Sequence, residues 1–403
     1  MTARPYLVNR LPTHAQPLDP YDAEMLNREA VQRVAKILAL RANRAETPLH
    51  NLAALATHLG IGSLSVKDEG LRLGLGSFKA LGGAYALMVL VQEEASRRLG
   101  RAIAVEELMS DTVRAIASTM TFACATDGNH GRSVAQGAQW LGARAVIFVH
   151  AGVSQARIAA IAGFGAEIVQ VKGGYDFSVQ EAARVAHESA WTLLSDTSWE
   201  GYEYIPSLVA QGYIVMVQEI LAKLPEPPTH VFLQAGVGSF AAAVAGHLAL
   251  VLGEQRPQVT IVEPERAACL YASAQQGLPV KLEASQATIM AMLECHEPSR
   301  LAFRILARVA DGFMTVDEAS APEIMQRLAS PLAGDPPIVA GESGGVGLAG
   351  LIAVLRDAKL ATELGLDQQA RVLIINTEGA TDPALYTQIV GRSPEAVLQG
   401  VRV

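Results

Sequence analysis

Through most of the chain, segments with apolar residues at helical spacing alternate with short apolar segments typical of strands. The first twenty residues show little periodicity, which predicts an extended arm, and residues 21–42 carry apolar side chains at helical spacing. A short helix and then a strand are expected within 47–70, after which strands alternate with longer helices. The expected strands are 113–120, 143–150, 166–173, 229–236, 258–265 and 370–379, and the helices that follow the strands include 154–165, 176–190 and 237–252.

This alternation predicts the class of fold. Strands that are apolar throughout belong to sheets covered on both faces, and strands joined by helices form parallel sheets. We therefore expect an α/β protein with two lobes, each a mostly parallel sheet flanked by helices. The predicted small domain, residues 91–190, is inserted into a large domain made of residues 1–90 and 191–403. No linker rich in Pro, Gly or Ser marks these boundaries.

Composition narrows the class of protein. Half of the 403 residues are hydrophobic, 18% are charged and the net charge is −8, which is the profile of a well-packed soluble enzyme and argues against nucleic-acid or membrane partners. No apolar run long enough for a transmembrane helix and no leader are expected. The three cysteines lack zinc-ligand spacing, which favours reduced thiols in the cytoplasm and no metal.

Two glycine-rich turns carry candidate chemistry. Gly236 and Gly238 separate an apolar strand from an alanine-rich helix, where backbone N–H groups and the Ser239 hydroxyl could bind a phosphate-sized anion. This turn matches neither the P-loop motif nor the dinucleotide-binding motif G-x-G-x-x-G. Its glycines could instead serve only to pack the helix against the strand. In "ATDGNHGRSVA", residues 125–135, short polar residues cluster at a helix start, where the alternative is N-capping by Asp127 or Asn129.

A third motif, "GSFKALGG" at residues 76–83, places Lys79 where a loop enters a helix, with Ser77 as a candidate N-cap. The macrodipole disfavours a cation near a helix N-terminus and favours the neutral amine that forms a Schiff base. A snorkelling surface lysine is the alternative reading.

Together the three motifs resemble the pyridoxal-phosphate enzymes of fold type II, which include the serine/threonine dehydratases and the tryptophan synthase β-subunit. The resemblance implies pyridoxal 5'-phosphate as cofactor, a Schiff base at Lys79 and a hydrogen bond from Asn129 to the phenolic oxygen of the cofactor. The further cofactor-binding residues that it implies are Phe78, the phosphate-binding residues Gly236, Val237, Gly238 and Ser239, and, near the pyridine nitrogen, Glu378 or its rival Thr381.

Within this group the chain resembles the 2,3-diaminopropionate ammonia-lyases from about residue 40 onward. The motifs that carry this resemblance are "GLGSFKALGGAYA", "ATDGNHGRSVA", "DTSWEGYEYIPSLVAQGYIVMVQEI", "QAGVGSFA", "GESGGVGLAG" and "INTEGATDP". It implies that Lys79 removes the α-proton of the L-isomer and Asp127 that of the D-isomer. Asp196 is suited to the second ammonium group of the substrate, with a helix cap before Trp199 as the alternative.

The expected reaction is α,β-elimination of diaminopropionate to pyruvate and two ammonia, in a homodimer. A serine/threonine or hydroxyaspartate dehydratase is the alternative, and a catalytically silent binding protein is disfavoured because Lys79 and the glycine turn are intact. Glu342 could serve a cation site or shape the cofactor pocket. Residues 290–300 depart from the family pattern, with Glu294 and His296 in place of small residues, so substrate choice is less certain than reaction class.

Overall fold

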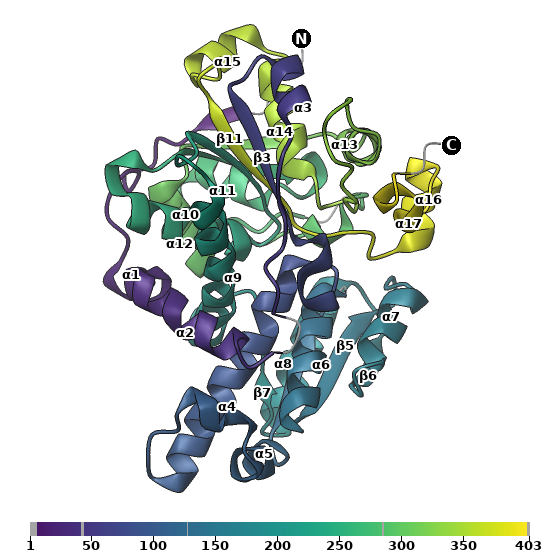
Figure 1. Ribbon diagram of the computed structural model, residues 1–403. Helices are drawn as coiled ribbons and strands as arrows, with labels where there is room; N and C mark the ends of the chain where they lie inside the picture. Colours follow the sequence, from purple (N-terminus) through teal and green to yellow (C-terminus); the bar gives the residue numbers. More distant parts are fainter. Residues whose placement is uncertain (1–5, 42–43, 127, 284–285, 401–403) are drawn as a thin grey trace. The chain divides into compact units, whose positions relative to one another are not determined.

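The computed structural model describes residues 6–41, 44–126, 128–283 and 286–400, and within them the chain forms two compact units (Figure 1). The large unit contains residues 1–27, 46–71 and 216–403, and the small unit contains residues 28–45 and 72–215. The α/β class predicted from the alternating pattern is confirmed, because each unit is a sheet flanked by helices.

The large unit is built on a seven-stranded sheet in the order β1-β10-β9-β8-β11-β3-β2. The five central strands are parallel, and the two edge strands, β1 and β2, pair antiparallel with their neighbours. Its strands are β1 Tyr6–Val8, β2 Leu49–Asn51, β3 Ser63–Asp68, β8 His230–Gln234, β9 Gln258–Pro264, β10 Gly312–Val316 and β11 Arg371–Asn376. Strand β8 is buried along its whole length, and its three central residues, Val231–Leu233, are apolar, as expected for a strand covered on both faces.

Helices cover this sheet, and α14 packs directly on β8, β9, β10 and β11. An apolar core lies between α14, α3 and the strands beneath them, and α10 packs against α12. The helices of the large unit are α1 Pro20–Leu26, α3 Ala53–Leu59, α10 Ser239–Leu252, α11 Cys269–Gln276, α12 Arg300–Val309, α13 Ser320–Ala329, α14 Val346–Leu355, α15 Ala358–Glu363, α16 Pro383–Val390 and α17 Pro394–Leu398.

The small unit holds a four-stranded parallel sheet in the order β6-β5-β4-β7. Helix α8 packs on β4, β5 and β7, while α6 packs on β4 and β5 and also contacts α4. Its strands are β4 Thr121–Ala125, β5 Arg144–His150, β6 Glu167–Val171 and β7 Thr192–Leu193. Its helices are α2 Arg28–Leu38, α4 Gly83–Leu99, α5 Asp111–Ala117, α6 Asn129–Leu141, α7 Gln155–Ala162 and α8 Tyr175–Glu188.

One predicted element is wrong. Residues 113–120 were expected to form a strand, but α5 occupies Asp111–Ala117 and the strand β4 begins at Thr121. The side chain of Ser110 caps this helix by accepting a hydrogen bond from the Val113 amide, and Val113 and Ala117 are buried on one helical face. An N-cap and an i, i+4 apolar pair therefore outweigh the β-branched residues of this segment.

The predicted domain boundaries at residues 91 and 190 both fall inside the small unit, and the division into domains at those residues stays a prediction. Helix α4 belongs to the small unit because it packs closely on α6: the Ala84 amide donates to the Ser133 hydroxyl over 2.9 Å. Helix α9, Tyr204–Lys223, begins in the small unit and ends in the large one. It is the one described helix long and apolar enough to cross a bilayer, and most of it is buried.

Candidate active site

Lys79 lies in a single 3-10 turn, η2 Phe78–Leu81, immediately before α4. The glycines around it allow this turn to pack tightly on α9. A Cβ on Gly82 would lie 2.5 Å from the Tyr213 ring, and a Cβ on Gly212 would collide with the Leu81 carbonyl. The S-x-K-x-x-G-G and Q-G-Y motifs are thus two sides of one close contact. Ser77 occupies the N-cap position of η2, but its side chain does not cap it.

The Lys79 amine donates a short hydrogen bond to Oδ2 of Asp196. The side chain of Lys79 is 21% exposed and that of Asp196 is 9% exposed, so the pair is largely shielded from water. Burial opposes the ionised form of Asp196, but the positive charge of Lys79, the electrostatic interaction with His130 and the hydrogen bond from Lys79 outweigh it and lower its pKa to about 2. Asp196 is therefore a carboxylate beside the lysine, and the next helix along the chain, α9, begins only at Tyr204.

The DTSWEGY segment fixes Asp196. Trp199 and Tyr202 form an isolated β-bridge with their rings stacked 4.3 Å apart. The Tyr202 hydroxyl donates to the Leu193 carbonyl over 2.7 Å and accepts from the Ser195 amide over 3.1 Å. This hydroxyl thus holds the chain on both sides of residue 194 and presents Asp196 directly beyond the end of β7.

His130 is a site residue that the predicted set omits. It is buried at the start of α6, its Nε2 contacts the Leu194 carbonyl at 2.9 Å, and its Nδ1 has no hydrogen-bond partner among the described residues. Burial lowers its pKa, and the charge of Lys79 lowers it further against the opposing effect of Asp196. The sequence signal is the ATDGNHG motif, in which roles were predicted only for Asp127 and Asn129.

The turn that precedes α6 is held by Thr126, whose hydroxyl accepts from the amides of Gly128 and Gly131. Asn129 is the first residue of α6 and is buried. Because β4 and β7 are parallel neighbours, the start of α6 and Asp196 both follow the carboxyl ends of strands at one edge of the sheet. Asp127 lies outside the described residues, so its role stays a prediction.

In the large unit, the loop between β8 and α10 has the geometry of an anion site. Gly238 precedes α10 with φ of +95°, a conformation that favours glycine, and the first amides of a helix have no intrahelical acceptor. A Cβ on Gly236 would lie 2.9 Å from Cys295 Sγ. We call residues Gly236–Ser239, for which the sequence predicts phosphate binding, the phosphate loop. The residues 292–295, part of the segment that departs from the family pattern, lie directly against it.

Glu378 follows β11, the strand that neighbours β8, so it lies at the same edge of the large sheet as the phosphate loop. Its side chain is buried, and the Gly341 amide donates to its carbonyl over 3.0 Å. A Cβ on Gly344 would collide with the Glu378 carbonyl, so the GESGG and NTEG motifs pack backbone to backbone. Glu342 is also buried. The Thr381 hydroxyl is buried and has no partner among the described residues.

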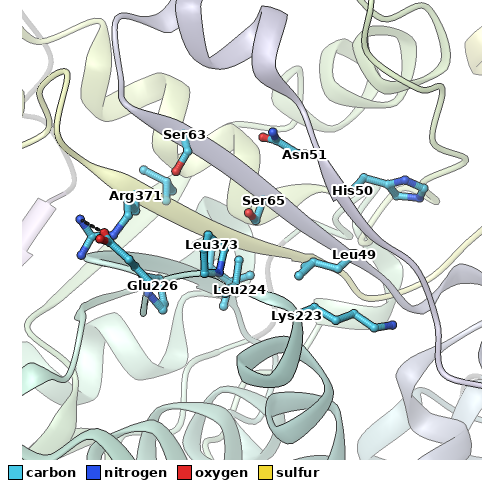
Figure 2. Close-up of a pocket in the computed structure, with 13 residues that line it drawn as sticks. Leu49, His50, Asn51, Ser63, Ser65, Lys223, Leu224, Glu226, Arg371 and Leu373 are labelled. Atoms are coloured by element: carbon cyan, nitrogen blue, oxygen red, sulfur yellow. Dashed lines mark ion pairs between the residues drawn. The ribbon is translucent and has the colours of Figure 1, made fainter.

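A pocket of about 230 Å³ in the large unit lies at the other end of these strands (Figure 2). Ser63 and Arg371, which begin β3 and β11, line it, and an ion pair of 3.2 Å joins Arg371 to Glu226. Ligands of parallel α/β sheets bind outside the carboxyl ends of strands, whereas this pocket is at the amino ends. It contains none of the predicted site residues.

The predicted residues thus fall into two sets. The small unit holds Phe78, Lys79, Asn129 and Asp196, and the large unit holds the phosphate loop, Glu378 and Thr381. Both sets suit pyridoxal phosphate: a partly exposed lysine beside a carboxylate can form a Schiff base, and a glycine loop at a helix start can hold a phosphate. Within the described residues no group of three or more His, Cys, Asp or Glu side chains could hold a metal ion.

This fold and these residues define a pyridoxal-phosphate-dependent enzyme of fold type II, and the family model described as "Pyridoxal-phosphate dependent enzyme" matches residues 40–378. Within that class the chain belongs to the diaminopropionate ammonia-lyase family.

The diaminopropionate ammonia-lyase of Salmonella typhimurium is 40% identical over 363 residues, which are 87% of this chain and 90% of that protein. The enzyme of Escherichia coli K12 is 41% identical over 358 residues, 87% of this chain and 88% of its own length. A crystal structure of the Escherichia coli enzyme in complex with D-serine matches with a TM-score of 0.86 and 36% identity, over 97% of this chain and 98% of the other.

Proposed function

We propose that this protein catalyses the α,β-elimination of 2,3-diaminopropionate, with pyridoxal phosphate as cofactor. The observation that carries the proposal is the buried pair of Lys79 and Asp196, held by the DTSWEGY segment. The full-length similarity to diaminopropionate ammonia-lyases supports the same substrate. Diaminopropionate and one water give pyruvate and two ammonia, so the reaction needs no oxidant or reductant.

Pyridoxal phosphate, when bound, withdraws electrons from the α-carbon of the amino acid and so makes its proton acidic. We assign Schiff-base formation to Lys79 and phosphate binding to residues Gly236–Ser239. Phe78 would contact the bound cofactor, Asn129 would hydrogen bond to its phenolic oxygen, and Glu378, with Thr381 as a rival contact, would hold its pyridine nitrogen.

Proton transfer is assigned to two groups. The Lys79 amine removes the α-proton of the L-isomer, and the Asp127 carboxylate removes that of the D-isomer. Asp196 is ionised and shielded from water, so it attracts the second ammonium group of the substrate and also keeps the Lys79 amine in place. Loss of the β-amino group then yields the first ammonia, and hydrolysis of the remaining product yields pyruvate and the second.

The alternative, a serine/threonine or hydroxyaspartate dehydratase of the same fold, differs in stoichiometry. A diamino acid releases two ammonia for each pyruvate, whereas serine or hydroxyaspartate releases one ammonia for each keto acid. The purified protein with pyridoxal phosphate is assayed on D- and L-diaminopropionate beside D- and L-serine and L-threonine. Higher kcat/KM on diaminopropionate, with two ammonia for each pyruvate, is the expected result. Preference for a hydroxy amino acid would contradict the proposal.

We also propose that the enzyme is a cytoplasmic homodimer. The three cysteines are described as free thiols, and two of them are buried, which suits a reducing compartment. Light scattering coupled to size-exclusion chromatography of the holoenzyme tests the dimer, for which the expected mass is twice that of the 42.6 kDa chain. A monomeric mass at assay concentration would contradict it.

A further inference from the structure

Glu263 is a fully buried carboxyl group near the end of β9 to which the reaction gives no role. Its two oxygens accept hydrogen bonds from consecutive amides at the start of α11, from Leu270 over 2.8 Å and from Tyr271 over 2.7 Å. The N-cap residue of α11 is Ala268, which has no side-chain acceptor. Glu263 therefore caps the helix from a neighbouring strand and fixes the position of its first turn.

That first turn contacts the phosphate loop through two residues. The Cys269 thiol donates to the Gly236 carbonyl over 3.6 Å. The Leu270 side chain lies against Gly238, because a Cβ at that glycine would be 3.0 Å from Leu270 Cδ1. Glu263, the first turn of α11 and the phosphate loop thus form a continuous series of contacts within the large unit.

Resting on the cofactor role assigned above, we propose that Glu263 is a positioning residue for the phosphate loop. Its carboxyl group fixes the positions of Cys269 and Leu270. These two side chains in turn hold Gly236 and Gly238 in the conformation that binds phosphate. A buried carboxyl group is costly unless its oxygens are hydrogen bonded, and here both oxygens are used to fix the turn beneath the loop.

The test is Glu263→Gln, which keeps the size of the side chain but replaces one acceptor oxygen by an NH₂ group facing an amide donor. Cofactor-free, full-length protein is titrated with pyridoxal phosphate and, separately, with pyridoxal, which lacks the phosphate. The dissociation constant for pyridoxal phosphate is expected to rise about tenfold or more, the equivalent of one lost buried hydrogen bond, while that for pyridoxal changes less than about twofold.

Asp335→Asn is the matched control. Asp335 caps α3 in the same way, accepting from the Ala54 amide over 2.9 Å and the Leu55 amide over 2.8 Å, but α3 packs on β3, whereas the atoms nearest Gly236 and Gly238 belong to other segments. This variant is expected to lower the melting temperature while leaving both dissociation constants unchanged. An equal loss of pyridoxal phosphate affinity in the control would overturn the inference.

Leu270→Val keeps the Glu263 cap and alters only the contact beneath Gly238, so it tests the same series of contacts if Glu263→Gln does not fold. It is expected to weaken pyridoxal phosphate more than pyridoxal. Equal weakening of both ligands in either variant, or of neither, overturns the inference. Wild-type protein that binds no pyridoxal phosphate would instead contradict the proposed function, and the inference with it.

Discussion

The two sets of site residues are held by different kinds of interaction. In the small unit, Lys79 and Asp196 are fixed by charge and by the Tyr202 hydroxyl. In the large unit, the phosphate loop is fixed by close backbone approach, since a Cβ at Gly236 or Gly238 would crowd its neighbours. The residues assigned to the reaction therefore depend on electrostatics and hydrogen bonds, whereas the loop assigned to the phosphate depends on glycines that leave room for the side chains packed around it.

This difference predicts that variants at Lys79 and Asp196 affect chemistry and that variants in the phosphate loop affect cofactor affinity. Removing a charged group in the small unit should lower turnover while leaving phosphate binding intact. Adding an atom in the large unit should weaken the cofactor while leaving the chemistry of the bound enzyme intact.

Lys79→Ala is expected to have the largest effect, because it removes the only group assigned to Schiff-base formation. Turnover of diaminopropionate should fall at least about 10⁴-fold, and the visible absorbance that forms with pyridoxal phosphate should disappear. Spectra and initial rates of the variant are compared with those of Lys223→Ala, a lysine that lines the pocket in Figure 2 and should be silent. Retained turnover in Lys79→Ala would show that another group bears the cofactor.

Asp127→Asn is expected to have the next largest effect, and it distinguishes the two isomers. It keeps the size of the side chain and removes the proton acceptor, so kcat for D-diaminopropionate should fall about 10²- to 10⁴-fold. The L-isomer should lose less, because Lys79 removes its proton. The measurement is kcat on each isomer. An equal loss on both would make Asp127 a binding or leaving-group residue, and no loss on either would make it a helix cap.

Gly238→Ala tests the large unit. The added Cβ combines a left-handed backbone angle with crowding by Leu270 and Ala302, so the dissociation constant for pyridoxal phosphate should rise about tenfold. Gly142→Ala is the control, because Gly142 has φ of +76° but open space around it. Both variants should lose similar stability, about 1 kcal/mol, from backbone strain. Equal cofactor affinity in the two variants would show that this loop does not bind the phosphate.

The sequence predicted the large-unit features more fully than the small-unit ones for a physical reason. A glycine turn between a strand and a helix is local, so Gly236–Ser239 can be read from adjacent residues. The contact between Lys79 and Asp196 joins residues 117 positions apart, and His130 contacts the Leu194 carbonyl, 64 positions away. These long-range contacts can be identified only in the folded protein, where β4 pairs with β7.

The same distinction explains the element that the pattern misassigned. In residues 113–120 the apolar side chains were compatible with a strand, but the Ser110 cap and the burial of one helical face decide for α5. The long strands β5, β9 and β11 lie where the sequence placed them, because strands buried on both faces are apolar throughout. In a segment as short as 113–120 the helix-start signal and the strand pattern compete, and tertiary packing decides between them.

Tyr202→Phe is expected to have the smallest effect, and it tests whether the Tyr202 hydroxyl positions Asp196 in the small unit. It keeps the ring stacked on Trp199 but removes the hydroxyl that joins the Leu193 carbonyl to the Ser195 amide. Leaving these two backbone groups without their partner should lower the free energy of unfolding by about 1–3 kcal/mol. Because Asp196 follows directly, kcat should fall several-fold, while the dissociation constant for pyridoxal phosphate should change little, since none of the residues assigned to the cofactor is altered. Tyr204→Phe is the control, since that exposed hydroxyl bonds Glu93 at the surface and its loss should cost less than about 0.5 kcal/mol. Chemical denaturation and steady-state kinetics measure both, and a weakened cofactor with unchanged kcat in Tyr202→Phe would contradict the division of roles between the two units.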